Sequence, residues 1–193
     1  MNIPNLLTIL RILLTPVFII FLFYEHPYAQ LWALLVFVIA SVTDAFDGYY
    51  ARKHDLVTES GRFLDPLADK ILVTSAFISF AYMGIIEYWM VVLIIFRDLF
   101  VTGLRMAMSH KGFSLLTSKI AKAKTGTQIG IIIFILLFLG IRNINLDMVK
   151  TVIHFLRQYQ FVYYLSLFVT LFTVYTGITY IYDNRAEIRQ FLS

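Results

Sequence analysis

Residues 44–70 read DAFDGYYARKHDLVTESGRFLDPLADK, and strongly apolar segments flank this stretch on both sides. Asp44 and Asp47 stand three residues apart, and Asp65 and Asp69 stand four apart. Side chains at these separations share one face of an α-helix. The stretch therefore predicts two neighbouring antiparallel helices, each carrying a pair of carboxylates, with a short polar connection between them.

The composition is that of a membrane protein. Of the 193 residues, 60% are hydrophobic and only 15% are charged, against about 25% charged residues in a soluble domain. The mean hydropathy is +0.78. The sequence has no cysteine, which excludes disulfides and thiolate metal sites. We expect an all-α integral membrane protein that forms a single domain over residues 1–193, with membrane lipids and no nucleic acid among its partners.

Six apolar runs approach the ~20 residues that a helix needs to cross a bilayer. Arg11 interrupts the first run, so we expect an N-terminal amphipathic helix over Asn2–Leu10 that lies along the membrane interface before a short span. Whether residues 147–158 form a further interfacial helix is left open by the sequence. The six predicted transmembrane helices are Leu6–Tyr24, Gln30–Tyr50, Leu64–Met83, Tyr88–Met108, Ala123–Ile141 and Phe161–Tyr182.

Six spans place both termini on the same side of the membrane, and the basic residues gather on that side. The opposite side holds only Arg142, Lys150 and Arg157. Because Lys and Arg are enriched in cytoplasmic loops, we expect both termini and all four aspartates at the cytoplasmic face of a multi-pass cell-membrane protein. The lack of an organelle-targeting segment favours a bacterial source. Aromatic residues expected near the outer ends of the spans are Tyr24, Tyr28, Trp32, Tyr82, Tyr88, Trp89, Tyr163 and Tyr164.

Four carboxylates at membrane depth require compensation. One ionised aspartate costs at least ~2.5–3.5 kcal/mol at the centre of a spanning helix, and two unit charges ~4 Å apart repel by ~4 kcal/mol at an effective dielectric constant of 20. Two divalent cations would neutralise the four charges, and an all-oxygen ligand set favours Mg²⁺ or Mn²⁺. Helix capping is the simpler explanation for a single residue such as Asp65 before Pro66, but it does not explain four aspartates at helical spacing.

The aspartates belong to a longer motif, DxxDGxxAR followed after eight residues by GxxxDxxxD. This motif resembles the signature of the CDP-alcohol phosphatidyltransferase family at every fixed position. The resemblance implies a homodimeric membrane enzyme in which an alcohol attacks the lipid-linked phosphate of a CDP-lipid and CMP is released. It also implies a dinuclear metal site.

The resemblance assigns roles to individual residues of the motif. Asp69 is the implied catalytic base and lies beside the metals. Gly48 and Ala51 make room for the cytidine nucleotide, although taken alone, without the carboxylate pairs beside them, they would favour close helix packing. The implied metal-site residues are Asp44, Asp47, Asp65 and Asp69. The implied contacts to the CDP-lipid within the motif are Asp47, Gly48, Ala51, Arg52 and Gly61.

Three further segments resemble the phosphatidylglycerophosphate synthase branch of that family. They read NIPNLLTILRILLTPVF at 2–18, FRDLFVTGLR at 96–105 and AKAKTGTQ at 121–128. In many members of the branch a glutamate follows the arginine of the second segment, where this chain has Asp98. By resemblance, the acceptor is glycerol 3-phosphate and the donor is CDP-diacylglycerol. The implied acceptor-phosphate contacts are Arg105, Lys122 and Lys124, and the implied donor contacts are Asn5, Thr8 and Arg11.

Several alternatives stay open at this point. Another acceptor, such as inositol phosphate, serine or a second lipid, would use the same donor chemistry. A divalent-cation transporter with an aspartate filter, or a structural membrane scaffold, would also place carboxylates in a membrane. The basic residues alternatively reflect cytoplasmic topology and attraction to anionic lipids, and Arg97 with Asp98 would be a structural ion pair, although adjacent helical residues point apart.

Overall fold

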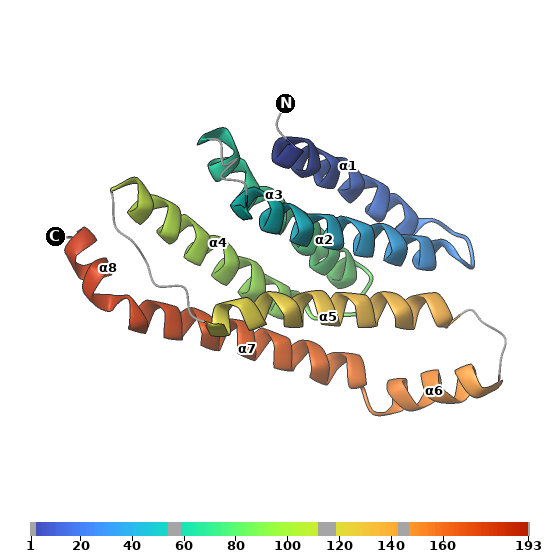
Figure 1. The fold of residues 1–193 in the computed structure, drawn as a ribbon. Coiled ribbons are helices and arrows are strands. Elements are labelled where there is room, and N and C mark those ends of the chain that lie inside the picture. The colour runs from blue at the N-terminus through green and yellow to red at the C-terminus, as the bar shows by residue number, and fades with distance from the viewer. Residues whose placement is uncertain (1–2, 54–58, 112–118, 143–146, 193) are drawn as a thin grey trace.

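The computed structural model describes residues 3–53, 59–111, 119–142 and 147–192. Within these ranges, the side chains of residues 3–8, 44–53, 59–69, 110, 119–122 and 192 lie outside the description. Every regular element of the described part is an α-helix, which confirms the all-α prediction. The helices are α1 (Ile3–Phe23), α2 (Ala29–Lys53), α3 (Glu59–Tyr82), α4 (Tyr88–His110), α5 (Lys119–Ile141), α6 (Asp147–Gln158), α7 (Phe161–Asp183) and α8 (Arg185–Leu192) (Figure 1).

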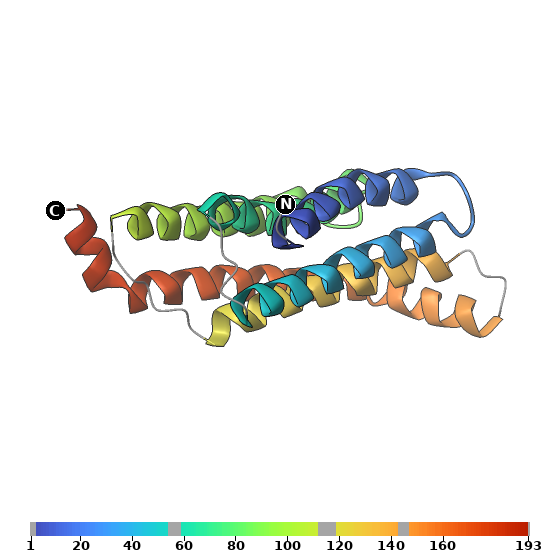
Figure 2. The same cartoon turned by 45° about the horizontal axis from the view of Figure 1, so that its top comes forward.

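The long helices form two packed layers. Figure 2 shows α1, α3 and α4 in one layer and α2, α5 and α7 in the other. Within the layers, α3 contacts both α1 and α4, and α5 contacts both α2 and α7. Between the layers, α1 packs on α2, α4 packs on α7, and α3 touches α5. The arrangement leaves α3 and α5 at the centre of the bundle.

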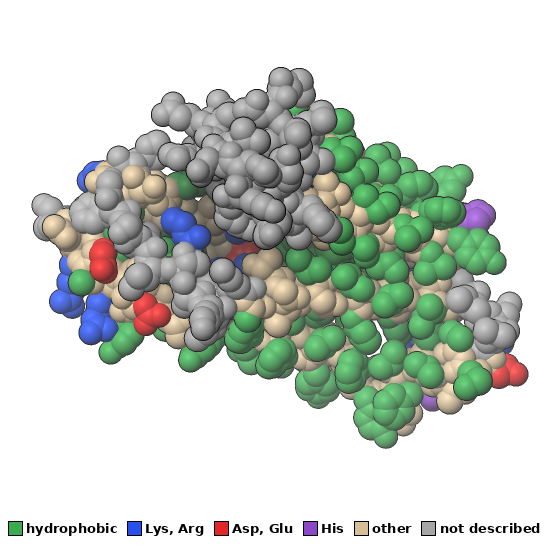
Figure 3. Space-filling view, viewed as in Figure 1, with side chains coloured by type: hydrophobic (Ala, Val, Ile, Leu, Met, Phe, Trp, Pro, Cys, Tyr) green, Lys and Arg blue, Asp and Glu red, His purple; other side chains and the backbone are tan. Residues whose placement is uncertain are grey.

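The two ends of the bundle differ in chemistry. Figure 1 shows the end of α2, the start of α3, the end of α4, the start of α5 and α8 toward one end of the molecule. Figure 3 shows most of the visible charged side chains at that end, and mainly hydrophobic ones toward the other. The aromatic side chains predicted near the outer ends of the spans are all exposed. This polarity agrees with the predicted orientation, which itself stays a prediction.

The core is built from aromatic and aliphatic side chains of all six long helices. Phe18 of α1 and Phe37 of α2 are fully buried, with ring centroids 5.7 Å apart. Phe77 and Phe80 of α3 belong to the same buried cluster. Tilted aromatic pairs of this kind add about 0.5–1.5 kcal/mol beyond the burial of their area. These contacts hold α1 against α2 and join both helices to the core residues of α3.

Helix α7 buries a line of small and polar residues. Ser166, Thr170 and Thr173 follow one another at intervals of four and three, and all are buried. Two of their hydroxyls donate hydrogen bonds back along the helix, from Ser166 to the Val162 carbonyl at 2.7 Å and from Thr170 to the Ser166 carbonyl at 2.8 Å. Small residues of this kind let helices approach closely in a membrane.

Helix α3 ends in a Schellman motif. The amide of Ile85 donates to the Phe80 carbonyl, and the amide of Gly84 donates to the Ala81 carbonyl, both at 2.9 Å. Gly84 has a φ of +68°, a left-handed conformation that glycine adopts at little cost. The motif turns the chain sharply, so that α4 begins at Tyr88 only a few residues later.

The predicted spans agree with the helices in position, but their number as membrane crossings is not confirmed. Among the described residues, Ala123–Ile141 and Phe161–Asp183 are long and apolar enough to cross a bilayer. Shorter apolar stretches are Ile9–Phe23, Ala29–Thr43 and Lys70–Tyr82. The predicted N-terminal interfacial helix is not a separate element, because α1 continues through Arg11 without a break.

The segment that the sequence left open forms a separate short helix, α6. Its side chains divide into an apolar and a polar face, and Ile153 is its buried residue. Met148, Val152 and Phe155 are exposed apolar side chains. Helix α6 packs on α7 at the end of the molecule opposite α8 (Figure 1).

Candidate functional site

The four aspartates lie where two helices approach their shared connection. Asp44 and Asp47 belong to the second half of α2, and Asp65 and Asp69 belong to the first half of α3. Their side chains lie outside the described residues, so their convergence on a metal pair stays a prediction. The same holds for the other predicted contacts whose side chains are not described, namely Asn5, Thr8, Gly48, Ala51, Arg52, Gly61 and Lys122.

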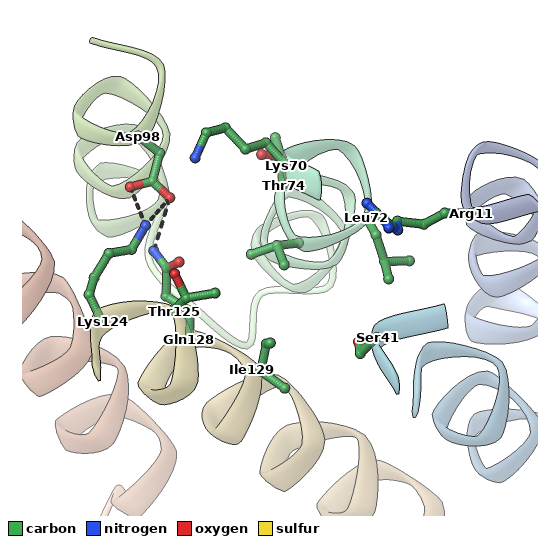
Figure 4. A pocket seen from close by; sticks show the side chains of 11 residues that line it. Arg11, Ser41, Lys70, Leu72, Thr74, Asp98, Lys124, Thr125, Gln128 and Ile129 are labelled. Carbon is green, nitrogen blue, oxygen red and sulfur yellow. Dashed lines mark hydrogen bonds and ion pairs between the residues drawn. The ribbon is translucent and has the colours of Figure 1, made fainter. Parts of the chain in front are cut away.

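A polar cavity of about 120 Å³ opens directly beside the aspartate-bearing segments. Ser41, on its wall, precedes Asp44 by three residues in α2, which is about 4.5 Å along the helix axis. Lys70, also on its wall, directly follows Asp69 in α3. Figure 4 shows the lining side chains, which are Arg11, Ser41, Lys70, Leu72, Val73, Thr74, Asp98, Lys124, Thr125, Gln128 and Ile129.

The cavity brings together charges from four helices. Arg11 comes from α1, Lys70 from α3, Asp98 from α4 and Lys124 from α5. Three of these side chains are cationic and one is anionic, so the lining carries a formal charge of two positive. The predicted donor contact Arg11 and the predicted acceptor contact Lys124 therefore line the same space. Arg11 is 4% exposed, so it does not mark a surface break in α1 as the sequence suggested.

Asp98 and Lys124 form the central ion pair of the site. The Lys124 Nζ lies 2.5 Å from both Oδ1 and Oδ2 of Asp98. The Gln128 Nε2 donates to Asp98 Oδ2 at 3.2 Å. On the other side, Nη1 of Arg97 lies 3.2 Å from Asp98 Oδ1, so the adjacent residues do interact despite their separation around the helix. Lys124 is 3% exposed and Asp98 is 7% exposed, which makes this a buried charge network.

Arg105 takes a different position. Its guanidinium carbon lies 5.5 Å from the ring centroid of Tyr180 in α7, a cation–π arrangement. Arg105 does not belong to the cavity lining that the described side chains form. Of the predicted acceptor contacts, Lys124 is thus the one whose side chain is described on the cavity wall.

Residues 1–178 match the sequence model of the family described as CDP-alcohol phosphatidyltransferase. The chain belongs to the CDP-alcohol phosphatidyltransferase family. The match covers helices α1 to α6 and most of α7, and therefore every residue that lines the cavity.

Curated members of this family show extended similarity to the chain. A Rickettsia bellii protein named CDP-diacylglycerol--glycerol-3-phosphate 3-phosphatidyltransferase is 38% identical over 91% of the chain and 92% of its own length. A Bacillus subtilis protein of the same name is 42% identical over 66% of the chain and 72% of its own length. A Mycobacterium tuberculosis protein named probable phosphatidylglycerophosphate synthase is 44% identical over 58% of the chain and 54% of its own length.

Some cavity residues of this CDP-alcohol phosphatidyltransferase were not predicted as site residues. Gln128 ends the segment AKAKTGTQ and stands four residues after Lys124, so helical spacing alone could have placed both on one face. The sequence alone does not decide whether Lys70, directly after the motif, contacts substrate or marks the membrane interface; its side chain lies on the cavity wall. No local signal pointed to Ser41.

Proposed function

We propose that the chain is a CDP-diacylglycerol–glycerol-3-phosphate 3-phosphatidyltransferase, which transfers the phosphatidyl group of CDP-diacylglycerol to sn-glycerol 3-phosphate and releases CMP. Relatives that carry this name, one of them aligned over 91% of the chain, support the assignment. The structural observation that supports this assignment most directly is the cationic cavity beside the aspartate-bearing parts of α2 and α3.

The charge of the cavity suits a phosphorylated acceptor. A phosphate monoester carries a charge of about −1.5 to −2 at neutral pH, and the cavity lining carries a formal charge of two positive. Carboxylates alone would repel such an anion, so an acceptor with a phosphate needs cations near the reaction centre. Lys124 and Lys70 supply them from the wall, and Lys122 and Arg105 are further proposed contacts at the same end of the bundle.

The ligand atoms that the motif offers suit divalent cations. Asp44, Asp47, Asp65 and Asp69 offer only hard oxygen ligands, which Mg²⁺ and Mn²⁺ prefer. Because Ser41 and Lys70 line one cavity, the adjoining segments of α2 and α3 border a common space. Among the described side chains, no three Asp, Glu or His residues gather elsewhere as a metal site. When bound, two such ions supply positive charge against the pyrophosphate of the donor.

The transfer itself needs one proton acceptor from the protein. A hydroxyl oxygen of glycerol 3-phosphate forms a bond to the phosphorus that carries the diacylglycerol, and the bond from that phosphorus to the CMP oxygen breaks. Asp69 takes the hydroxyl proton as general base, a role typically worth about 10²–10⁴ in rate. The adjacent Lys70 and the nearby Lys124 hold the acceptor phosphate, so that the hydroxyl faces Asp69.

The donor contacts are proposed on the opposite flank of the cavity. Arg11, which lines the cavity from α1, contacts the phosphates of CDP-diacylglycerol, together with Asn5 and Thr8 earlier in the same helix. Gly48 and Ala51 leave room for the cytidine beside Asp47. Arg52 and Gly61 complete the proposed donor site, near the C-terminal end of α2 and the N-terminal end of α3.

The proposed setting is a bacterial cell membrane. Six helices, α1 to α5 and α7, cross the bilayer as one domain, with the active site and both termini in the cytoplasm and with a homodimeric assembly. The separation of basic and aromatic residues toward opposite ends supports this orientation, and the bacterial origin of the named relatives supports the source. The acyl chains of the donor remain in the lipid phase throughout.

An acceptor panel tests the proposed reaction. Purified chain in detergent is mixed with CDP-diacylglycerol and Mn²⁺ or Mg²⁺, and CMP release is measured with glycerol 3-phosphate, inositol phosphate, serine or a lipid alcohol, each with and without chelator. We expect chelator-sensitive release that depends on glycerol 3-phosphate. Preference for an acceptor without phosphate would contradict the proposed substrate. Metal flux in proteoliposomes without CMP release would instead indicate a transporter.

A further inference from the structure

Asp98 is a buried carboxylate with an unusually complete set of partners. Both of its oxygens lie 2.5 Å from the Lys124 ammonium, one accepts a hydrogen bond from Gln128 at 3.2 Å, and the other lies 3.2 Å from Arg97. Figure 4 shows Lys70 reaching from α3 toward the same carboxylate. Asp98 therefore connects side chains of α4 and α5 at the wall of the cavity.

The contacts of Asp98 fix the position of the Lys124 ammonium. A lysine side chain has four rotatable bonds and a compact charge, so the side chain alone does not fix the position of its ammonium group. Charge-assisted hydrogen bonds to two oxygens of one carboxylate remove much of that freedom. An ammonium has three donors, and the two bonds to Asp98 leave one N–H for a ligand. Lys124 also lines the cavity.

We propose that Asp98 is a positioning residue for the acceptor site: it holds the Lys124 ammonium where its remaining N–H meets the acceptor phosphate, and Gln128 holds Asp98. This inference rests on the proposed function. Asp98 touches neither substrate, so its effect on the acceptor passes through Lys124. Its carboxylate also lowers the formal charge of the cavity lining from three positive to two positive. This charge balances one phosphate dianion and limits unproductive binding of other anions.

A purely structural ion pair between Asp98 and Lys124 would give different kinetic results on mutation. Loss of either partner of a buried pair leaves an unpaired charge and destabilises the fold, but a structural role predicts no selective effect on one substrate. A positioning role predicts that the acceptor KM changes while the KM for CDP-diacylglycerol does not. It also predicts that the effect of Asp98 disappears once Lys124 has been replaced.

A double-mutant cycle tests the proposal. Asp98→Asn, Lys124→Gln and the double variant are assayed for CMP release at varied glycerol 3-phosphate and at varied CDP-diacylglycerol. We expect each single variant to raise the acceptor KM about tenfold or more, the range of a lost charge-assisted hydrogen bond. The double variant should be no worse than the worse single variant, because both act through one contact. Asp98→Glu, which keeps the charge, should restore most of the acceptor affinity.

Asp147→Asn is the matched control. Asp147 pairs with Lys150 at 3.9 Å on the exposed surface of α6, so the same chemical change there should leave both KM values unaltered. A second, independent readout is the rise in the Tm of the detergent-solubilised protein on addition of glycerol 3-phosphate. That rise should be smaller in Asp98→Asn than in the wild-type chain.

Gln128→Met keeps the proposal testable if Asp98→Asn does not fold. Gln128 is 2% exposed, and methionine is close to it in volume, so the variant removes the bond to Asp98 without removing charge. We expect an acceptor KM roughly two- to fivefold higher, a small effect because the lost bond acts on the acceptor only through Asp98 and Lys124. An unchanged acceptor KM in folded Asp98→Asn or Gln128→Met, or additive effects in the cycle, would overturn the positioning role.

Failure of the proposed function gives a different result. A wild-type chain without glycerol 3-phosphate-dependent CMP release would overturn the proposed reaction and the positioning role with it. An active wild-type chain with normal acceptor KM in the Asp98 variants would overturn the positioning role alone.

Discussion

The backbone of Gly177 in α7 lies directly against the side chain of Arg97 in α4. A Cβ atom built on Gly177 would be 2.8 Å from Cγ and 3.3 Å from Nε of Arg97. Arg97 in turn reaches Asp98 at 3.2 Å. The missing side chain at Gly177 therefore lets α4 and α7 approach each other and leaves room for an arginine that borders the charged site.

Replacement of Gly177 by alanine should destabilise the protein. The Cγ of Arg97 is close to its own backbone, so it cannot move aside as the tip of a side chain would. We expect about 1–3 kcal/mol from overpacking, partly offset by the ~0.5–1 kcal/mol that alanine contributes over glycine in a helix. The measurement is the Tm of the detergent-solubilised variant against that of the wild-type chain.

Gly130→Ala in α5 is the matched control, because a Cβ there meets no atom within 4 Å. It should have an unchanged or slightly higher Tm, since only the gain in helix propensity remains. Equal Tm values for the two variants would contradict the close α4–α7 contact.

Two of the three cations predicted for the acceptor phosphate, Lys124 and Arg105, should differ in effect. Lys124 lines the cavity, whereas Arg105 lies over the ring of Tyr180. We expect Lys124→Gln to raise the KM for glycerol 3-phosphate by about tenfold or more, and Arg105→Gln to raise it less. Steady-state CMP release at varied acceptor concentration measures both. An equal or larger increase for Arg105→Gln would contradict the larger contribution expected of Lys124.

Much of the helical frame follows from the sequence, because the apolar runs and the polar connections mark helix ends locally. The predicted spans Ala123–Ile141 and Phe161–Tyr182 differ from α5 and α7 by at most a few residues. The connection expected over Lys53–Ser60 overlaps both helices at its ends, because α2 runs to Lys53 and α3 begins at Glu59. The aspartate motif identified the family, since its eight fixed positions are local in the sequence.

The charge network was not predictable from the same local pattern. Asp98 and Lys124 are separated by 26 positions, and their contact depends on how α4 and α5 pack. The sequence suggested that Arg11 separates an interfacial helix from a span. In the structure Arg11 is buried and its side chain lines the cavity. Which helix faces pair is set by tertiary packing, and a single sequence carries little direct information about it.

Asp69→Asn tests the proposed catalytic base. Asparagine keeps the size of the side chain but cannot accept the hydroxyl proton, so we expect CMP release to fall by roughly 10²–10⁴-fold at saturating substrates. The Tm should stay close to the wild-type value, since the change is isosteric. A variant with wild-type CMP release would contradict the assignment of Asp69 as base.

Divalent cations should be required and should bind to the aspartate motif. We expect chelation to abolish CMP release and added Mn²⁺ or Mg²⁺ to restore it, because four carboxylates in one site need positive charge. Titration of chelated protein with Mn²⁺, followed by electron paramagnetic resonance, should give two bound ions per wild-type chain and fewer in Asp44→Ala or Asp65→Ala. The exposed Asp147→Ala is the control and should bind two. Wild-type stoichiometry in the Asp44 and Asp65 variants would contradict the proposed ligands.

The six-span orientation can be tested by labelling, because the sequence contains no cysteine. Lys150 in α6 and Ala186 in α8 are both exposed and lie at opposite ends of the molecule (Figure 1). With cytoplasmic termini, a membrane-impermeant maleimide should label Lys150→Cys in right-side-out vesicles, and Ala186→Cys only after permeabilisation. Retained CMP release in each variant confirms that the fold is intact. Labelling of both positions from the same side would show that α7 does not cross the membrane between them. The six-span arrangement, which places the aspartates in the cytoplasm, would then be wrong.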